Sequence, residues 1–224
     1  MCSKKYYEAY EERYKKAHAE GIQWFGSESS PIVGEIITKY DIRPHMQILE
    51  LGCGEGRDAQ YLLKNGYNLL AVDISQEAIN YCKKTFPDYD NHFKVIDCVN
   101  GSLSEKFDFI YAVAVVHMLV PDEDRNKFYK FIFDHLTTNG VALICSMGNG
   151  KTERRSDINA AFELQERECR GKKIMVAGTS CRMVNNETFE AEIRNNDLNI
   201  LETGQTCIPD EFPEMMYAVV KRVN

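Results

Sequence analysis

The chain has 224 residues, 44% of them hydrophobic, so it can bury one sizeable core but is too short for two full domains. Its formal net charge of -7 at pH 7 argues against a broad basic face for nucleic acid, because neutralising phosphates requires clustered Lys and Arg. We find neither an apolar signal core nor an apolar run near the roughly 20 residues of a membrane span, so we expect a cytoplasmic protein without membrane contact. The eight cysteines include no Cys-x-x-Cys pair, and we expect reduced thiols and no metal site.

Residues 1–44 are interpreted as a helical cap or lid. Residues 3–20 are charged and aromatic, and their tyrosines recur about one helical turn apart, which predicts an amphipathic helix. A glycine-flanked aromatic loop with Trp24 and Phe25 follows, and a helix near 31–40 begins at a proline. The aromatic rings would close over a site in the rest of the chain. The alternative to a lid is that these aromatic residues form a stripe that packs into the hydrophobic core.

From residue 45 onward, short apolar runs alternate with helical patterns. The predicted strands lie near residues 47–51, 68–72, 92–96, 107–114 and 140–146. The predicted helices between them lie near residues 56–65, 75–86 and 122–136. Several of the strands are apolar throughout, which suits a parallel sheet covered on both faces. Residues 45–224 are therefore expected to form one domain with a doubly wound, Rossmann-like α/β fold.

This alternation is interrupted at residues 148–183, which we interpret as an insertion. The residue pattern of this insertion predicts a loop, a charged helix near 156–170 and a segment that contains several glycines. A helix near 186–195 follows. Strands near 198–206 and 214–222 are expected to pair as an antiparallel hairpin at the edge of the sheet.

The sequence ELGCGEG at residues 50–56 places three glycines at alternate positions between a predicted strand and a predicted helix. Glycine admits positive φ angles and lets a ligand approach the main chain, and the first N–H groups of a helix face electronegative groups. The dinucleotide fingerprint requires a glycine where Arg57 stands, which disfavours a nicotinamide-binding oxidoreductase. A glycine-rich turn without any ligand is the structural alternative.

Acidic residues end three of the predicted strands. Asp73 is placed to accept hydrogen bonds from both hydroxyls of a ribose, and Asp97 to accept one from an exocyclic amine. Glu50 could face a cationic amino group. An ammonium, a ribose and an adenine amine describe one ligand, although capping of strand ends would also explain the acids.

Together these motifs resemble the class I S-adenosylmethionine-dependent methyltransferases over about residues 45–147. ELGCGEG resembles their first motif, AVDIS the second, Asp97-Cys98 the third and FDFIYAVAVVHML the fourth. The resemblance implies a seven-stranded sheet, mostly parallel with an antiparallel last strand. It also implies S-adenosylmethionine as cofactor and S-adenosylhomocysteine as product. The sequences GRDA and VVHML are similar to small-molecule members of the tellurite-resistance and thiopurine methyltransferase types.

The resemblance implies which residues hold the cofactor. Glu50 would support its amino group, while Asp73 and Asp97 would hold the ribose and the adenine amine. The other residues expected at the cofactor site are Gly52, Cys53, Gly54, Gly56, Ile74, Cys98, Val113, Ala114 and Trp24.

The implied reaction is direct in-line displacement of the methyl group by a nitrogen, oxygen or sulfur nucleophile. The candidate catalytic residues are His117, a base by its motif position, and Tyr14 of the lid. A histidine that only packs or hydrogen-bonds the cofactor is the alternative to a base.

The acceptor is expected to be a small molecule in an enclosed pocket. No Asn-Pro-Pro-Tyr or Asp-Pro-Pro-Tyr sequence follows the fourth predicted strand, which together with the acidic balance argues against a nucleic-acid substrate. The insertion is expected to form part of the acceptor pocket, with Arg154, Arg155 and Arg182 available for a carboxylate or phosphate. A protein or RNA methyltransferase, a non-catalytic S-adenosylmethionine-binding protein and a homodimer all stay open.

The substitution Asp73→Ala tests the expected placement of the ribose. It removes two hydrogen bonds, each worth about 0.5 to 1.5 kcal/mol or more when charged, so cofactor affinity should fall at least tenfold. Calorimetric titration of wild type and variant measures the difference. Unchanged affinity would place the cofactor elsewhere.

Overall fold

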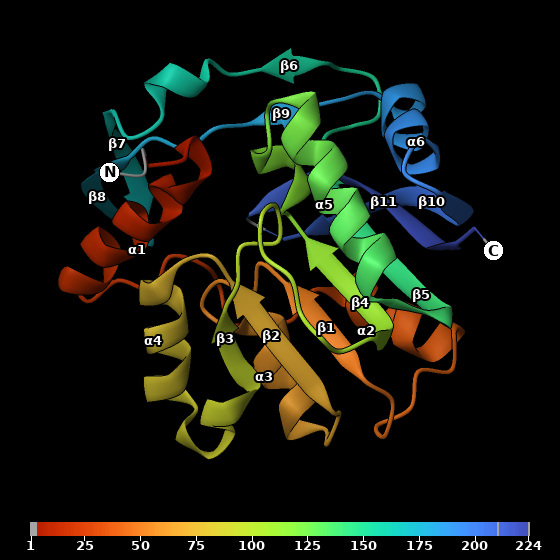
Figure 1. Ribbon diagram of the computed structural model, residues 1–224. Helices are drawn as coiled ribbons and strands as arrows, with labels where there is room; N and C mark the ends of the chain where they lie inside the picture. The colour runs from red at the N-terminus through yellow and green to blue at the C-terminus, as the bar shows by residue number, and fades with distance from the viewer. Residues whose placement is uncertain (1–3, 210, 224) are drawn as a thin grey trace.

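The computed structural model describes residues 4–209 and 211–223. At its centre is a seven-stranded sheet with the order β10-β11-β5-β4-β1-β2-β3 (Figure 1). Its strands are β1 Ile48–Leu51, β2 Leu69–Asp73, β3 Phe93–Val95, β4 Phe107–Val113, β5 Leu136–Met147, β10 Leu198–Ile208 and β11 Phe212–Arg222. Strands β1 to β5 are parallel, and β11 runs antiparallel to both β5 and β10. The predicted Rossmann-like sheet with an antiparallel edge hairpin is confirmed.

Helices cover both faces of this sheet. They are α2 Pro31–Lys39, α3 Arg57–Lys64, α4 Gln76–Thr85, α5 Asp122–His135 and α6 Asn186–Arg194. Successive residues of a strand point to opposite faces, so Ile48 packs with α2, α3 and α4 while Leu49 packs with α5 and α6. In Figure 1, α5 lies in front of the sheet, and α2 and α3 lie behind it. Within the described residues, every helix is too short or too polar to span a bilayer.

The strand order reverses at β1, which has β2 on one side and β4 on the other. At such a switch point the connections leave neighbouring strands toward opposite faces, and a crevice opens at the carboxyl ends of the strands. The glycines after β1 and residues 114–118 after β4 flank this crevice.

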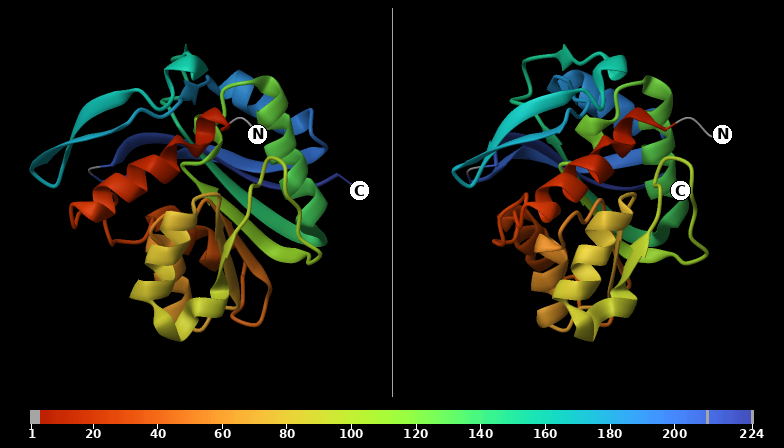
Figure 2. Two further views of the ribbon diagram at one scale, coloured as in Figure 1. Left: turned by 60° about the vertical axis from the view of Figure 1, so that its left-hand side comes forward. Right: turned by 90° about the vertical axis from the view of Figure 1, so that its left-hand side faces the viewer.

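The N-terminal segment crosses the carboxyl end of the sheet (Figure 2). It consists of the 3-10 helix η1 Tyr6–Glu8 and the helix α1 Ala9–Ala19, as predicted, although residue 3 of the predicted helix lies outside the described residues. The helix α2 packs against the sheet instead, with Val33 and Ile36 in the core. The division of the chain at residue 44 stays a prediction.

The predicted helix near 156–170 is wrong. The insertion contains β6 Arg154–Arg155, the 3-10 helix η4 Ile158–Ala160, β7 Leu164–Cys169, β8 Lys172–Ala177 and β9 Arg182–Met183. Strands β7 and β8 form a hairpin that projects from the molecule (Figure 2). Its turn residues Arg170 and Gly171 both have positive φ angles, as a two-residue hairpin turn requires, and β8 packs on α1. Turn chemistry and packing therefore outweigh the helix-forming composition of the segment.

The substitution Leu49→Ala tests the packing of the central strand. Leu49 is fully buried, and truncating a buried leucine lowers the free energy of unfolding by about 2 to 5 kcal/mol. Leu164→Ala is the matched control, since Leu164 is 70% exposed and its loss should change stability by less than about 0.5 kcal/mol. Urea unfolding measures both. Equal effects would contradict the burial described here.

Candidate functional site

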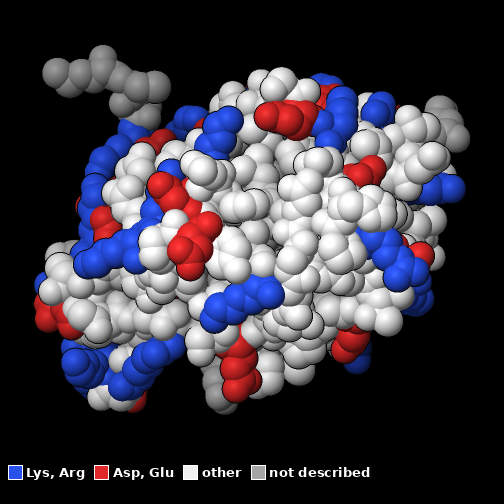
Figure 3. Space-filling view, turned by 90° about the horizontal axis from the view of Figure 1, so that it is seen from below, with Lys and Arg blue, Asp and Glu red and all other residues white. Residues whose placement is uncertain are grey.

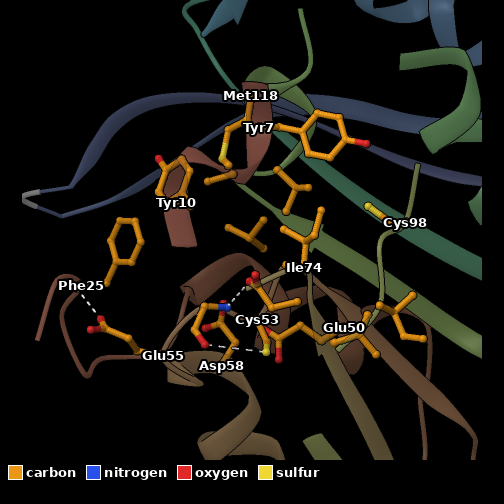
Figure 4. A pocket seen from close by; sticks show the side chains of 18 of the residues that line it. Tyr7, Tyr10, Phe25, Glu50, Cys53, Glu55, Asp58, Ile74, Cys98 and Met118 are labelled. Atoms are coloured by element: carbon orange, nitrogen blue, oxygen red, sulfur yellow. Dashed lines mark hydrogen bonds between the residues drawn. The ribbon is translucent and has the colours of Figure 1, made fainter. Parts of the chain in front are cut away.

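A cavity lies at the carboxyl ends of β1, β2 and β4 (Figure 4). It holds about 1020 Å³ of empty space, including its open mouth. Most of the residues singled out in the sequence line it: Tyr14, Glu50, Gly52, Cys53, Gly54, Asp73, Ile74, Asp97, Cys98, Val113 and Ala114. Segments that are far apart in the chain are thus brought together at the switch point.

Two positions of the glycine loop after β1 require glycine. Gly52 and Gly54 have φ angles of +70° and +52°. A Cβ at Gly52 would lie 2.5 Å from Val115 Cγ2, and a Cβ at Gly54 would lie 2.8 Å from the Tyr14 hydroxyl oxygen. The missing side chains leave main chain exposed to the cavity, which suits a ligand that approaches closely.

Asp73 fixes the loop from the end of β2. One carboxylate oxygen accepts a hydrogen bond from the Gly54 amide and the other from the Ser75 amide, both at 2.8 Å. Burial raises the pKa of Asp73 in spite of these bonds. Each carboxylate oxygen can accept a second hydrogen bond, so Asp73 can also accept from hydroxyls of a ligand.

Glu50 carries a buried oxygen without a partner. The residue is 5% exposed, and no described residue donates to its Oε2 atom. Burial, followed by the nearby charge of Asp58, raises the pKa of Glu50 well above its usual range. An unpaired buried acceptor is costly, so a cationic donor in the cavity would stabilise this carboxylate.

Asp97 already has partners in the N-terminal segment. Its Oδ2 atom accepts from Lys5 Nζ at 2.6 Å and from the Tyr7 hydroxyl at 3.2 Å. Its Oδ1 atom accepts from the Val99 amide at 2.8 Å. Burial opposes ionisation, but the Lys5 bond and the other donors lower the pKa of Asp97. The contact between Asp97 and Lys5 was not predicted from the sequence.

Apolar residues complete the half of the cavity between Asp73 and Asp97. Ile74 and Cys98 line it there, and Val113 lines the cavity at the end of β4, on the other side of β1. Burial raises the pKa of Cys98 to about 12, so the thiol stays neutral. Ala114 directly follows β4 and has a φ angle of +59°, a strained conformation for alanine that turns the chain beside the cavity.

Comparison with known proteins agrees with this geometry. Residues 48–140 match a methyltransferase domain. The chain is 24% identical to phosphoethanolamine N-methyltransferase 1 of Zea mays over 222 residues, covering 92% of this chain and 42% of that protein. It is 26% identical to the probable S-adenosyl-L-methionine-dependent methyltransferase TehB of Haemophilus influenzae over 118 residues, 52% of this chain and 41% of that one. The chain thus spans less than half the length of these curated relatives.

Two solved structures have the same fold. A S-adenosylmethionine-dependent methyltransferase from Clostridium acetobutylicum superposes with a TM-score of 0.68 at 19% identity, covering 94% of this chain and 96% of that one. The 1,6-didemethyltoxoflavin-N1-methyltransferase of Burkholderia thailandensis gives a TM-score of 0.69 at 15% identity, covering 93% and 84%. Both likenesses show the fold, and the part of the chain that matches a family model, residues 48–140, matches a methyltransferase domain.

Three of the predicted residues do not line the cavity. Gly56 faces the core, where a Cβ would lie 2.9 Å from Cys82 Sγ. Trp24 points away and lies over the Arg13 guanidinium at 4.8 Å, so its neighbour Phe25 lines the cavity instead. Both positions still shape the site through the backbone.

His117 is the third of these residues. It is buried behind Phe212, with 5.8 Å between the ring centroids, and its Nδ1 atom has no partner among the described residues. Burial, followed by the charge of Arg125, lowers the pKa of His117 to about 4. The ring is therefore neutral near pH 7.

The N-terminal cover, residues 4–26, forms the wall opposite the glycine loop. Tyr7, Tyr10, Tyr14 and Phe25 of this cover line the cavity. Burial raises the pKa of the Tyr14 hydroxyl well above its usual value, so the phenol keeps its proton.

Sequence reasoning missed several residues of the cavity. Five of them are Glu55, Arg57, Asp58, Met118 and Phe212. Four of these five are in or beside quoted motifs, but their neighbours in space were not visible in the sequence. Arg57 donates to Glu211 at 2.5 Å, and Glu211 also accepts from the Gly26 amide. The turn between β10 and β11 thereby joins the N-terminal cover at the cavity mouth.

The arginines of the insertion do not line the cavity. Arg154 and Arg155 are exposed, and Arg182 donates to the Val120 carbonyl and pairs with Asp122. Ser180 donates to the Met118 carbonyl at 2.7 Å, so the insertion supports the cavity wall from outside. Its part in acceptor binding stays a prediction. Within residues 4–209 and 211–223, no group of three His, Cys, Asp or Glu side chains is arranged to hold a metal ion.

The substitution Gly54→Ala tests the close approach of the cover to the glycine loop. The new Cβ would displace Tyr14, so affinity for S-adenosylhomocysteine should fall at least tenfold. Gly66→Ala is the matched control, because Gly66 also has a positive φ of +79° but no atom within 4 Å of the added Cβ. Both variants should lose about 1 to 2 kcal/mol of stability from backbone strain. Equal affinities in the two variants would contradict a functional role for this contact.

Proposed function

We propose that the chain transfers a methyl group from S-adenosylmethionine to a small-molecule nucleophile and releases S-adenosylhomocysteine. The observation that carries this proposal is the unpartnered Glu50 oxygen inside a cavity that also contains the glycine loop and the Asp73 carboxylate. A ligand with an ammonium and a ribose would satisfy both acids, and the open main chain of Gly52 and Gly54 admits it closely.

Each cofactor-binding residue has a proposed partner. Glu50 would accept from the amino group, and Asp73 would accept from the ribose hydroxyls with its free lone pairs. Ile74 and Cys98 would lie against the adenine, and Asp97 would accept from its amine in addition to or in place of Lys5. When bound, S-adenosylmethionine supplies a methyl group made electrophilic by its sulfonium.

The protein's own task is to align the acceptor and exclude water. Positioning can contribute up to about 7 to 11 kcal/mol of barrier reduction in well-oriented systems. Tyr10, Phe25, Met118 and Phe212 supply apolar walls around the cavity, where the methyl group and the acceptor would meet. The acceptor atom, whether nitrogen, oxygen or sulfur, would approach from the side of the N-terminal cover.

Tyr14 is the candidate catalytic residue that the geometry favours. Its ring lines the cavity beside Gly54, and the protonated phenol can donate a hydrogen bond that orients the acceptor. His117 would reach the acceptor only if Phe212 moved, so a role as base stays a prediction.

The N-terminal cover favours a small-molecule substrate over a macromolecular one. The tyrosines of α1 close one side of the cavity, whereas a protein or RNA substrate requires an open groove. On the face shown in Figure 3, Lys and Arg side chains lie among Asp and Glu side chains rather than in one continuous band. A cytoplasmic location belongs to the same proposal. The named acceptors of the relatives differ from one another, so none of them is carried over to this chain.

Calorimetric titration with S-adenosylmethionine, S-adenosylhomocysteine and NADH tests the proposal. We expect micromolar binding of the first two and none of NADH, followed by formation of S-adenosylhomocysteine in a screen of amines, thiols and phenols. Tight binding without product from any acceptor would favour a non-catalytic binding protein. Binding of NADH alone would refute the proposal.

A further inference from the structure

A buried carboxylate joins the glycine loop to the N-terminal cover. Glu55 lies between two of the loop glycines and is 3% exposed. Its two carboxylate oxygens accept hydrogen bonds from the amides of Trp24 and Phe25, each at 2.8 Å. Figure 4 shows the bond to Phe25 at the edge of the cavity. Glu55 therefore holds the end of the cover against the loop that forms the proposed cofactor site.

The same carboxylate faces His18 of α1. His18 Nε2 lies 2.9 Å from Glu55 Oε1, and His18 Nδ1 lies 2.8 Å from Glu77 Oε1 of α4. Neutral imidazole carries one N–H group, whereas imidazolium donates from both ring nitrogens. A protonated His18 therefore donates to both carboxylates at once, and a neutral ring can donate to only one of them.

The surroundings of His18 favour its charge. Burial lowers the pKa of His18, but the hydrogen bonds and charges of Glu55 and Glu77 outweigh burial, so the pKa is raised. The titratable groups in contact with the ring are Glu55 of the glycine loop, Glu77 and Tyr81 of α4, and Tyr14 of α1. The elements packed there also carry the Glu11–Lys15 pair on α1 and Arg170 of the β7–β8 turn, which donates to the Phe25 carbonyl.

We propose that Glu55 and His18 are positioning residues: protonated His18 clamps α1 between the glycine loop and α4, and deprotonation loosens the N-terminal cover. Tyr14 stands one helical turn before His18, and Phe25 is held by the same carboxylate, so the clamp controls two walls of the cavity. This inference rests on the proposed function, because it takes S-adenosylhomocysteine as the ligand over which the cover closes.

The direction of the pH effect follows from the raised pKa. The clamp is fully present below the ordinary histidine pKa of about 6.5. It is lost as the pH rises through the raised pKa of the closed state, because Glu55 and Glu77 then share one N–H group. Affinity for S-adenosylhomocysteine should therefore fall with rising pH.

Titration with S-adenosylhomocysteine between about pH 6 and about pH 8.5 measures this dependence. In wild type, we expect the dissociation constant to rise about tenfold, the effect of one hydrogen bond between charged groups. In His18→Gln it should stay near the high-pH value at every pH. Glu77→Gln should shift the midpoint to lower pH, and the exposed His45→Gln should behave as wild type.

Hydrogen exchange gives a readout that does not depend on the cofactor. The amides of Trp24 and Phe25 donate to Glu55, so peptides covering residues 22–26 should lose protection in His18→Gln relative to wild type at about pH 6, and the difference should shrink as the pH rises through the raised pKa of His18.

Two results would overturn the clamp. They are unchanged protection of residues 22–26 in His18→Gln, or an equal pH dependence of binding in wild type and that variant. Protection that changes as expected in a protein that binds no S-adenosylhomocysteine would instead refute the proposed function and leave the clamp as a property of the fold.

Discussion

The Gly54 amide donates to the Asp73 carboxylate, and this hydrogen bond ties the loop after β1 to the end of β2. The loop can adopt its path only because glycine tolerates the left-handed conformation and because no Cβ intrudes on Val115 or Tyr14. The open main chain of the cavity depends on this arrangement. The N-terminal cover depends on it as well, since Tyr14 occupies the space beside Gly54.

Two buried acidic residues, Glu50 and Asp73, line the cavity. Burial raises the pKa of both Glu50 and Asp73, which means that the protein's own groups stabilise the charges of these two carboxylates poorly. A ligand that brings a positive charge and hydroxyl donors would recover that lost stabilisation. Asp97 differs because Lys5 already supplies its positive charge. At this end of the cavity, the chain's own lysine therefore pairs with the acid, whereas no described residue donates to Glu50 Oε2.

Hydrogen bonds join the glycine loop to the N-terminal cover. Gly52 and Gly54 face the cavity, while Glu55 of the same loop holds the amides of Trp24 and Phe25. Glu55 therefore connects the cover to the proposed cofactor site within a single peptide segment. The turn after β10 adds a second connection through Glu211, which pairs with Arg57 and accepts from the Gly26 amide.

The sequence by itself determined a mostly parallel, doubly wound sheet and a glycine loop after its first strand, because apolar runs and alternate glycines reflect local backbone rules. It could not show that residues 164–177 form a hairpin, since the two-residue turn at Arg170 and Gly171 and packing on α1 outweigh helix propensity. Nor could it show that His117 lies behind Phe212. Tertiary structure alone decided which side chains meet. Glu55 and His18 are 37 positions apart in the sequence, and only the folded chain brings the carboxylate within hydrogen-bond distance of the imidazole.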